Sequence, residues 1–204
     1  MTDITDKRPG EEFPPALWTP LTEADITVLR RQNRGRRFDA DLVYAVAARC
    51  SRGCPQVTVC YPAARGGKPF PTLFWLTCPH LSRVCGALES NQAVSELESV
   101  FAEITGEVEA WHERYAALRA RLLKEQSGRL TEAEILSVSK LTDGYGVGGI
   151  SWRAMPSAAK CLHLQTATML GLGSHPAEEW LRAKLGFMEC GGAPCLKTPA
   201  SDAD

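Results

Sequence analysis

The residues best suited to chemistry in this sequence are cysteines and histidines, several of which stand where predicted strands and helices begin or end. The chain contains eight cysteines and four histidines among its 204 residues. Thiolate and imidazole groups are ligands of zinc, and thiolates also hold iron–sulfur clusters. The N-terminal residues lack the apolar stretch of a signal peptide, so we expect a cytoplasmic, reducing environment. There, metal binding or thiol chemistry is favoured over a framework of disulfides.

Three cysteines are expected at one edge of a small sheet. Segments rich in β-branched and aromatic residues predict three strands, at 41–48, 56–61 and 72–77. Short turns between them predict an antiparallel up-down-up meander, in which the first and third strands end at the same edge. Cys50 follows the first strand, Cys78 follows the third, and Cys54 lies in the turn between the first two.

A further thiol and an imidazole stand close together later in the chain, in the run Lys160-Cys161-Leu162-His163. Three cysteines and one histidine form a standard tetrahedral zinc set. We therefore predict a metal site made of Cys50, Cys78, Cys161 and His163, with zinc as the first choice of metal and an iron–sulfur cluster as the second. One difficulty is that residues two apart on a regular helix point about 200° away from each other, and a helix is expected from Pro156 to about residue 170.

Two other functions remain open. In a metal-free thiol enzyme, Cys161 would be the nucleophile, because a helix N-terminus together with Lys160 or His163 would lower its pKa. The glycine-rich stretch upstream could bind an anion through the backbone amides of Gly146, Gly148 and Gly149. The third class is a non-catalytic interaction module.

The order of elements predicts an α+β fold, with the three-stranded antiparallel sheet followed by a mostly helical C-terminal half. Thr22 is the expected N-cap of an early helix, and further helices are expected over 107–126, over 132–140 and from Pro176 toward residue 186. His112 falls among charged residues, which predicts a solvated side chain. We expect a flexible N-terminal arm (1–20), one domain (21–188) and a disordered tail (189–204).

The net charge of −1 gives the chain no overall attraction for nucleic acid or anionic membranes. No apolar run is long enough to span a membrane. Nucleic acid would require a local patch, for which the sequence offers one basic cluster, namely Arg30, Arg31, Arg34, Arg36 and Arg37. The partner is expected to be an unidentified small molecule or protein.

Four blocks of the sequence resemble the bacterial domain-of-unknown-function family 501 over roughly residues 36–180. They are Arg49-Cys50, the run from Lys68 to Pro79, Leu88-Glu89, and the run from Lys160 to His163. The resemblance implies that the predicted ligands lie in family blocks, whereas Cys54, Cys60 and Cys85 do not. It implies no activity, and the chain departs from the family at Ser174-His175-Pro176, where an Asn-Pro pair is expected.

Overall fold

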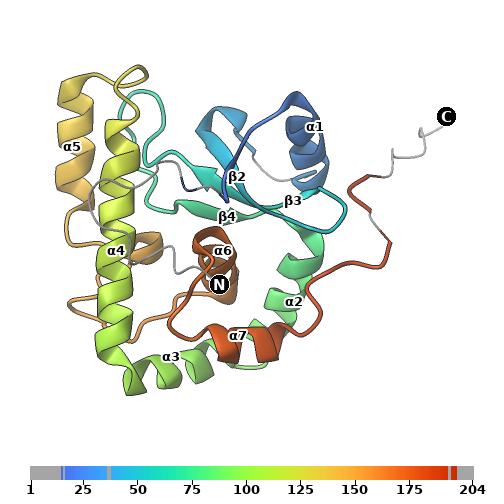
Figure 1. The fold of residues 1–204 in the computed structure, drawn as a ribbon. Helices are drawn as coiled ribbons and strands as arrows, with labels where there is room; N and C mark the ends of the chain where they lie inside the picture. The colour runs from blue at the N-terminus through green and yellow to red at the C-terminus, as the bar shows by residue number, and fades with distance from the viewer. Residues whose placement is uncertain (1–14, 16, 36–37, 193, 197–204) are drawn as a thin grey trace.

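Four antiparallel strands, arranged in chain order, form the central sheet (Figure 1). The computed structural model describes residues 15, 17–35, 38–192 and 194–196. The strands are β1 (Thr19–Pro20), β2 (Val43–Arg49), β3 (Pro55–Cys60) and β4 (Phe74–Leu76). The α+β class and the antiparallel sheet are confirmed, but the sheet has four strands rather than three. The additional strand, β1, lies in a proline-rich segment. This segment was expected to be a loose arm because proline lacks a backbone hydrogen-bond donor.

Seven α-helices surround this sheet in the part of the chain that the structure describes. They are α1 (Glu23–Gln32), α2 (Pro79–Glu89), α3 (Ala93–Glu103), α4 (Thr105–Lys124), α5 (Glu132–Thr142), α6 (Leu162–Leu172) and α7 (Glu178–Leu185). In Figure 1, α1 lies on one side of the sheet and α6 on the other, while α4 and α5 stand beside each other at one end. None of the described helices has the length and apolar character needed to cross a membrane.

The predicted start of α1 is confirmed by its cap. The Thr22 hydroxyl accepts a hydrogen bond from the Asp25 amide, and the Asp25 carboxylate accepts one from the Thr22 amide. This capping box satisfies donors that a helix leaves free at its N-terminus. Most of the predicted N-terminal arm, residues 1–14 and 16, lies outside the described residues, as does 197–204 of the predicted tail.

Helix α6 is the element on which the sheet packs. Nine of its eleven residues are buried, as is typical of a helix enclosed by protein on all sides. The ring of Phe74 in β4 lies so close to Gly171 that a Cβ there would come within 2.2 Å of it. Trp18 donates a hydrogen bond to the Gly171 carbonyl oxygen at 2.9 Å. The absence of a side chain at Gly171 therefore lets the C-terminal end of α6 approach the sheet.

The start of α6 corrects the sequence prediction. Pro156 was expected to open the helix, whereas residues 152–154 and 156–157 form turns and the helix begins at Leu162. Lys160 has a φ of 69°, and a helix cannot continue through a residue with positive φ. Cys161 is consequently the N-cap, with an extended backbone, rather than a residue inside the helix.

Candidate metal centre

Three side chains with metal-binding groups converge where α2 ends and α6 begins. Glu89 is the last residue of α2, Cys161 is the N-cap of α6, and His163 lies in its first turn. One ligand atom from each lies within 4.8 Å of the other two, and no other such group occurs among the described residues. Because Cys161 precedes the helix, the 200° separation of residues two apart on a regular helix does not apply to this pair.

The carboxylate of Glu89 holds the start of α6. Its Oε1 accepts hydrogen bonds from the amides of Leu162 at 2.6 Å and of His163 at 3.3 Å. These amides have no acceptor within the helix, and the helix dipole stabilises a negative charge at this end. The same oxygen lies 2.9 Å from Nδ1 of His163. Since all three contacts use Oε1, a metal bound through Oε2 would leave the helix cap in place.

Hydrogen bonds also fix the ring of His163. Its Nε2 lies 3.0 Å from the carbonyl oxygen of Ser82. A carbonyl oxygen only accepts, so Nε2 carries the proton, and Nδ1 faces the Glu89 carboxylate. The ring can be an imidazolium that donates to both partners, or it can bind a metal through Nδ1. Metal-binding histidines commonly donate their other ring N–H to a backbone carbonyl, as His163 does here.

The thiol of Cys161 is not activated by its surroundings alone. Burial raises its pKa, and the amide of Leu164 and the ammonium group of Lys160 only partly offset this effect. At neutral pH the free side chain is therefore a thiol. A bound metal ion would favour the thiolate, because its positive charge outweighs the cost of burial.

A cavity of about 360 Å³ adjoins these residues. Its lining comprises Thr72, Phe74, Trp75, Leu76, Ser82, Lys160, Cys161, His163 and Leu164. This size suits a small ligand, as does the combination of apolar walls with a few polar groups. The ammonium group of Lys160 donates to the Gly148 carbonyl oxygen at 2.8 Å, which ties the glycine-rich stretch to this wall.

The four cysteine and histidine ligands predicted from the sequence lie in two places. Cys161 and His163 are grouped with Glu89, whereas Cys50 and Cys78 line a different, smaller cavity. The reason is that the C-terminal tail, and not α6, covers the sheet edge at which β2 and β4 end. Glu89 was not among the predicted ligands, although the Leu88-Glu89 pair is one of the blocks that resemble the family.

The other predicted site residues have structural contacts or lie outside the described residues. The amide of Gly146 donates to the Ile150 carbonyl at 2.8 Å, and that of Gly149 to the Gly146 carbonyl at 3.2 Å. The Gly148 amide contacts the Tyr115 hydroxyl, so the amides proposed for anion binding are all engaged within the chain. In the basic cluster, Arg30 and Arg31 form the last turn of α1, while residues 36–37 are not described.

Comparison with known proteins gives a family and no relative of known activity. A family model described as a protein of unknown function (DUF501) matches residues 46–183. The matched region contains Glu89, Cys161 and His163, and it ends before Cys190. No significant match was found among curated proteins or among solved structures.

Proposed function

Because the chain belongs to the DUF501 family, whose description assigns no activity, we propose a function from its own residues: it binds one zinc ion through Glu89, Cys161 and His163. The fourth coordination position would face the adjoining cavity, where the zinc ion would act on a small molecule. Three protein ligands and one open position are typical of catalytic zinc sites, whereas structural sites are closed by four. The observation that carries the proposal is the convergence of three ligand groups, two of which, Cys161 and His163, line a cavity.

The separation of the ligand atoms agrees with zinc. Zinc–nitrogen and zinc–oxygen bonds of about 2.1 Å at a tetrahedral angle place the two ligand atoms about 3.4 Å apart. The nearer carboxylate oxygen of Glu89 lies 2.9 Å from Nδ1 of His163. Loading zinc therefore requires a shift of a few tenths of an ångström, or a turn of the carboxylate to present Oε2. An iron–sulfur cluster is disfavoured here because only one thiolate is present.

The proposed chemistry is hydrolysis by a zinc-bound water. Zinc held by Glu89, Cys161 and His163 would lower the pKa of a water molecule at the open position to about 7 and so would supply a nucleophile for hydrolysis at neutral pH. Phe74 and Trp75 provide an apolar wall that would hold the non-reacting part of a substrate and exclude bulk water. Lys160 adds a positive charge at the same wall, suited to a substrate that is negatively charged or becomes so during the reaction.

The alternative is a metal-free thiol enzyme with Cys161 as nucleophile, and its position at a helix N-terminus favours it. The geometry supports it less well. In such an enzyme the histidine would turn one ring nitrogen toward the thiol and the other toward the carboxylate. Here Nε2 of His163 is bound to the Ser82 carbonyl instead, and burial keeps the pKa of Cys161 high.

Zinc content tests the proposal on the full-length chain purified under reducing conditions. Elemental analysis is expected to show one zinc ion fewer per chain in His163→Ala and in Cys161→Ser than in the wild type. Glu98→Gln is the matched control, because Glu98 accepts a hydrogen bond from the Ala159 amide at 3.1 Å but is not part of the ligand group. Unchanged zinc content in His163→Ala and Cys161→Ser would contradict the proposal. Fast alkylation of Cys161 in zinc-free protein at neutral pH would support the thiol enzyme instead.

A further inference from the structure

Five cysteines surround a second, much smaller cavity at the sheet edge covered by the C-terminal tail. Its volume is about 10 Å³, close to the space that one water molecule occupies. The lining residues that bear on the argument are Cys50, Cys54, Cys78, Cys190, Cys195 and Arg52. The first two stand at the ends of the turn between β2 and β3, the third is the N-cap of α2, and the last two cysteines belong to the tail. Three distant segments thus bring sulfur atoms to a space the size of a single ion.

We propose that Cys50, Cys54, Cys78 and Cys195 hold a second zinc ion, which fastens the C-terminal tail to the edge of the sheet. Four cysteines without an open position form a closed, structural zinc site. Cys54, Cys78 and Cys195 are 5%, 7% and 8% exposed, as befits ligands of a buried ion. Cys50 and Cys190 are both half-buried. Cys50 is assigned as the fourth ligand because the turn holds it beside Cys54, and Cys190 is a fifth thiol at the rim. This site shares no residue with the one at Glu89, so the failure of one proposal would not affect the other.

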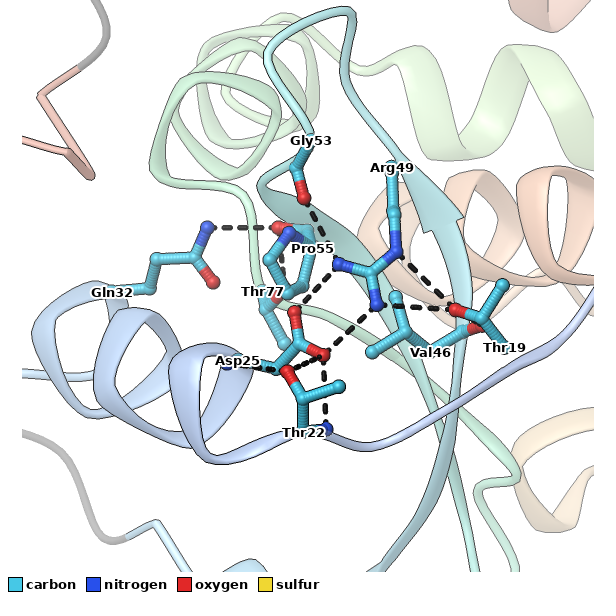
Figure 2. A network of polar contacts seen from close by, with 9 residues as sticks. All are labelled: Thr19, Thr22, Asp25, Gln32, Val46, Arg49, Gly53, Pro55 and Thr77. Carbon is cyan, nitrogen blue, oxygen red and sulfur yellow. Dashed lines mark hydrogen bonds and ion pairs between the residues drawn. The ribbon is translucent and has the colours of Figure 1, made fainter.

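The turn that carries Cys50 and Cys54 is held in place by its neighbours. The Cys50 amide donates to the Cys54 carbonyl oxygen at 3.0 Å. Figure 2 shows the surrounding network, in which Arg49 donates to the Gly53 carbonyl oxygen at 2.9 Å and forms two hydrogen bonds, of 2.6 and 2.9 Å, with the Asp25 carboxylate. Bidentate pairs of this kind add geometric precision as well as energy. Both thiols are therefore positioned before a metal binds.

The tail is anchored to the same turn by polar contacts. The Ser51 amide and hydroxyl donate to the Glu189 carboxylate at 3.1 and 3.0 Å. The side-chain amide of Gln32 donates to the Pro55 carbonyl oxygen at 2.8 Å and lies 3.4 Å from the sulfur of Cys195. Arg52 donates a hydrogen bond to the Cys190 carbonyl oxygen at 2.5 Å, and Gln56 donates one to the Met188 carbonyl oxygen at 3.1 Å. Nε2 of His80 lies 3.0 Å from the Phe187 carbonyl oxygen. These contacts place Cys195 opposite the turn without a bond between sulfurs.

The free thiols of Cys54 and Cys78 in this cavity are protonated at neutral pH. Burial, together with the neighbouring thiols of Cys50 and Cys195, raises the pKa of Cys54 to about 11. Burial also raises the pKa of Cys78. Several thiolates cannot coexist in so small a space unless a cation compensates them, and a divalent ion does so directly. Arg52 at the cavity wall would offset part of the excess negative charge of four thiolates around zinc.

Binding requires the sulfur atoms to move inward. No three of these five sulfurs lie within 4.8 Å of one another, whereas zinc–sulfur bonds of 2.3 Å place tetrahedral sulfurs about 3.8 Å apart. At least one sulfur-to-sulfur distance must therefore shorten by about 1 Å or more. The tail and the exposed turn are the segments that would supply it, because Cys78 belongs to the packed core.

The test uses the full-length chain carrying His163→Ala, so that the first site is empty and the remaining zinc can be counted. One zinc ion per chain is expected in this parent. Cys54→Ser, Cys78→Ser and Cys195→Ser are each expected to abolish it, whereas Cys190→Ser is expected to keep it. Cys60→Ser is the matched control, since Cys60 is equally buried but outside the cavity. Substitution by cobalt(II) should give strong thiolate-to-metal absorption in the parent and not in Cys54→Ser.

A second measurement on the wild-type chain guards against variants that lose zinc only because they fail to fold. Removal of zinc with a chelator is expected to speed amide hydrogen exchange in residues 187–196 at least tenfold, and added zinc should reverse the change. The inference is overturned if Cys54→Ser and Cys78→Ser retain the zinc of the parent. It is equally overturned if the parent contains no zinc and mass spectrometry shows disulfides among these cysteines, or if chelation leaves exchange in the tail unchanged.

Discussion

Two buried histidines should make the stability of this protein strongly dependent on pH. His112 is 0% exposed and His175 is 8% exposed. Burial lowers the pKa of His112 to about 4. Burial, together with the nearby His112, lowers the pKa of His175 to about 3. An unfolded chain has histidines with pKa values near 6.5, so below that pH the unfolded state binds more protons than the folded state.

The hydrogen bonds of the two imidazole rings also predict that stability falls as the pH falls. Nδ1 of His112 accepts from the Val147 amide at 3.1 Å, and Nδ1 of His175 accepts from the Ala177 amide at 3.0 Å. Protonation of either Nδ1 would remove the lone pair that accepts this bond. A buried amide would then lack its acceptor, which would lower the free energy of unfolding. The stabilisation is therefore fully present above pH 6.5, and it is lost as the pH falls from 6.5 toward the folded pKa values.

The size of the loss in stability follows from the difference between the histidine pKa values in the folded and unfolded states. At pH 5, each histidine in the unfolded chain lies 1.5 pH units below its pKa of about 6.5, and proton linkage then costs the folded state about 2 kcal/mol per residue. The two together lower the free energy of unfolding by about 4 kcal/mol between pH 7.5 and pH 5. A domain of this size is stabilised by about 5–15 kcal/mol in total, so the loss should be easily measured.

Urea unfolding followed by tryptophan fluorescence at pH 7.5, 6.5, 5.5 and 5.0 measures this dependence. His175→Gln is expected to remove about half of the slope, because glutamine carries no titrating proton in this range. A loss of less than about 1 kcal/mol between pH 7.5 and pH 5, or an unchanged slope in His175→Gln, would refute the reasoning.

Four further predictions concern stability. The Arg49 guanidinium holds the pKa of Asp25 below its ordinary value, so Asp25→Asn should cost about 2–3 kcal/mol in urea unfolding at neutral pH, and the cost should shrink as the pH falls below about 4. Lys160→Gly should be about 1 kcal/mol more stable than Lys160→Ala, the reverse of the usual order, because φ is positive there. Gly171→Ala should lower the free energy of unfolding by about 1–3 kcal/mol, because the added methyl group would clash with the ring of Phe74. Gly86→Ala, which meets nothing within 4 Å in α2, should raise it by up to about 1 kcal/mol.

Local signals in the sequence predict much of the fold. The N-cap at Thr22 and three of the four strands follow from residue types and spacing alone. The strand β1 could not be found in this way, because its two residues pair with β2 through contacts that a proline-rich sequence does not signal. The early start predicted for α6 failed because the positive φ of Lys160 is set by the packing around it.

Burial was harder to predict than secondary structure. His112 follows charged residues of α4 and was expected to be solvated, yet it is completely buried. The residue that covers it is Gly146, whose missing Cβ would lie 2.2 Å from Nδ1 of the histidine ring. A loop distant in the sequence thus closes over a helix face that looks polar by composition. Such closure depends on tertiary packing, so a pattern based on helical periodicity cannot detect it.

The same limit explains why the predicted four-residue metal site is divided between two places. Each candidate site contains a cysteine that is the N-cap of a helix, and in both helices a histidine follows two residues later: Cys78 with His80 and Cys161 with His163. Only His163 is part of a site, because His80 does not line the second cavity. Locally the two motifs are equivalent, since each places a thiol beside the free amides of a first helical turn. They differ in what tertiary structure brings to them: a carboxylate, Glu89, at α6, and the cysteine-bearing tail at α2. The residue types therefore predict that metal ligands are present, but the segments packed against each helix start decide which of them can share an ion.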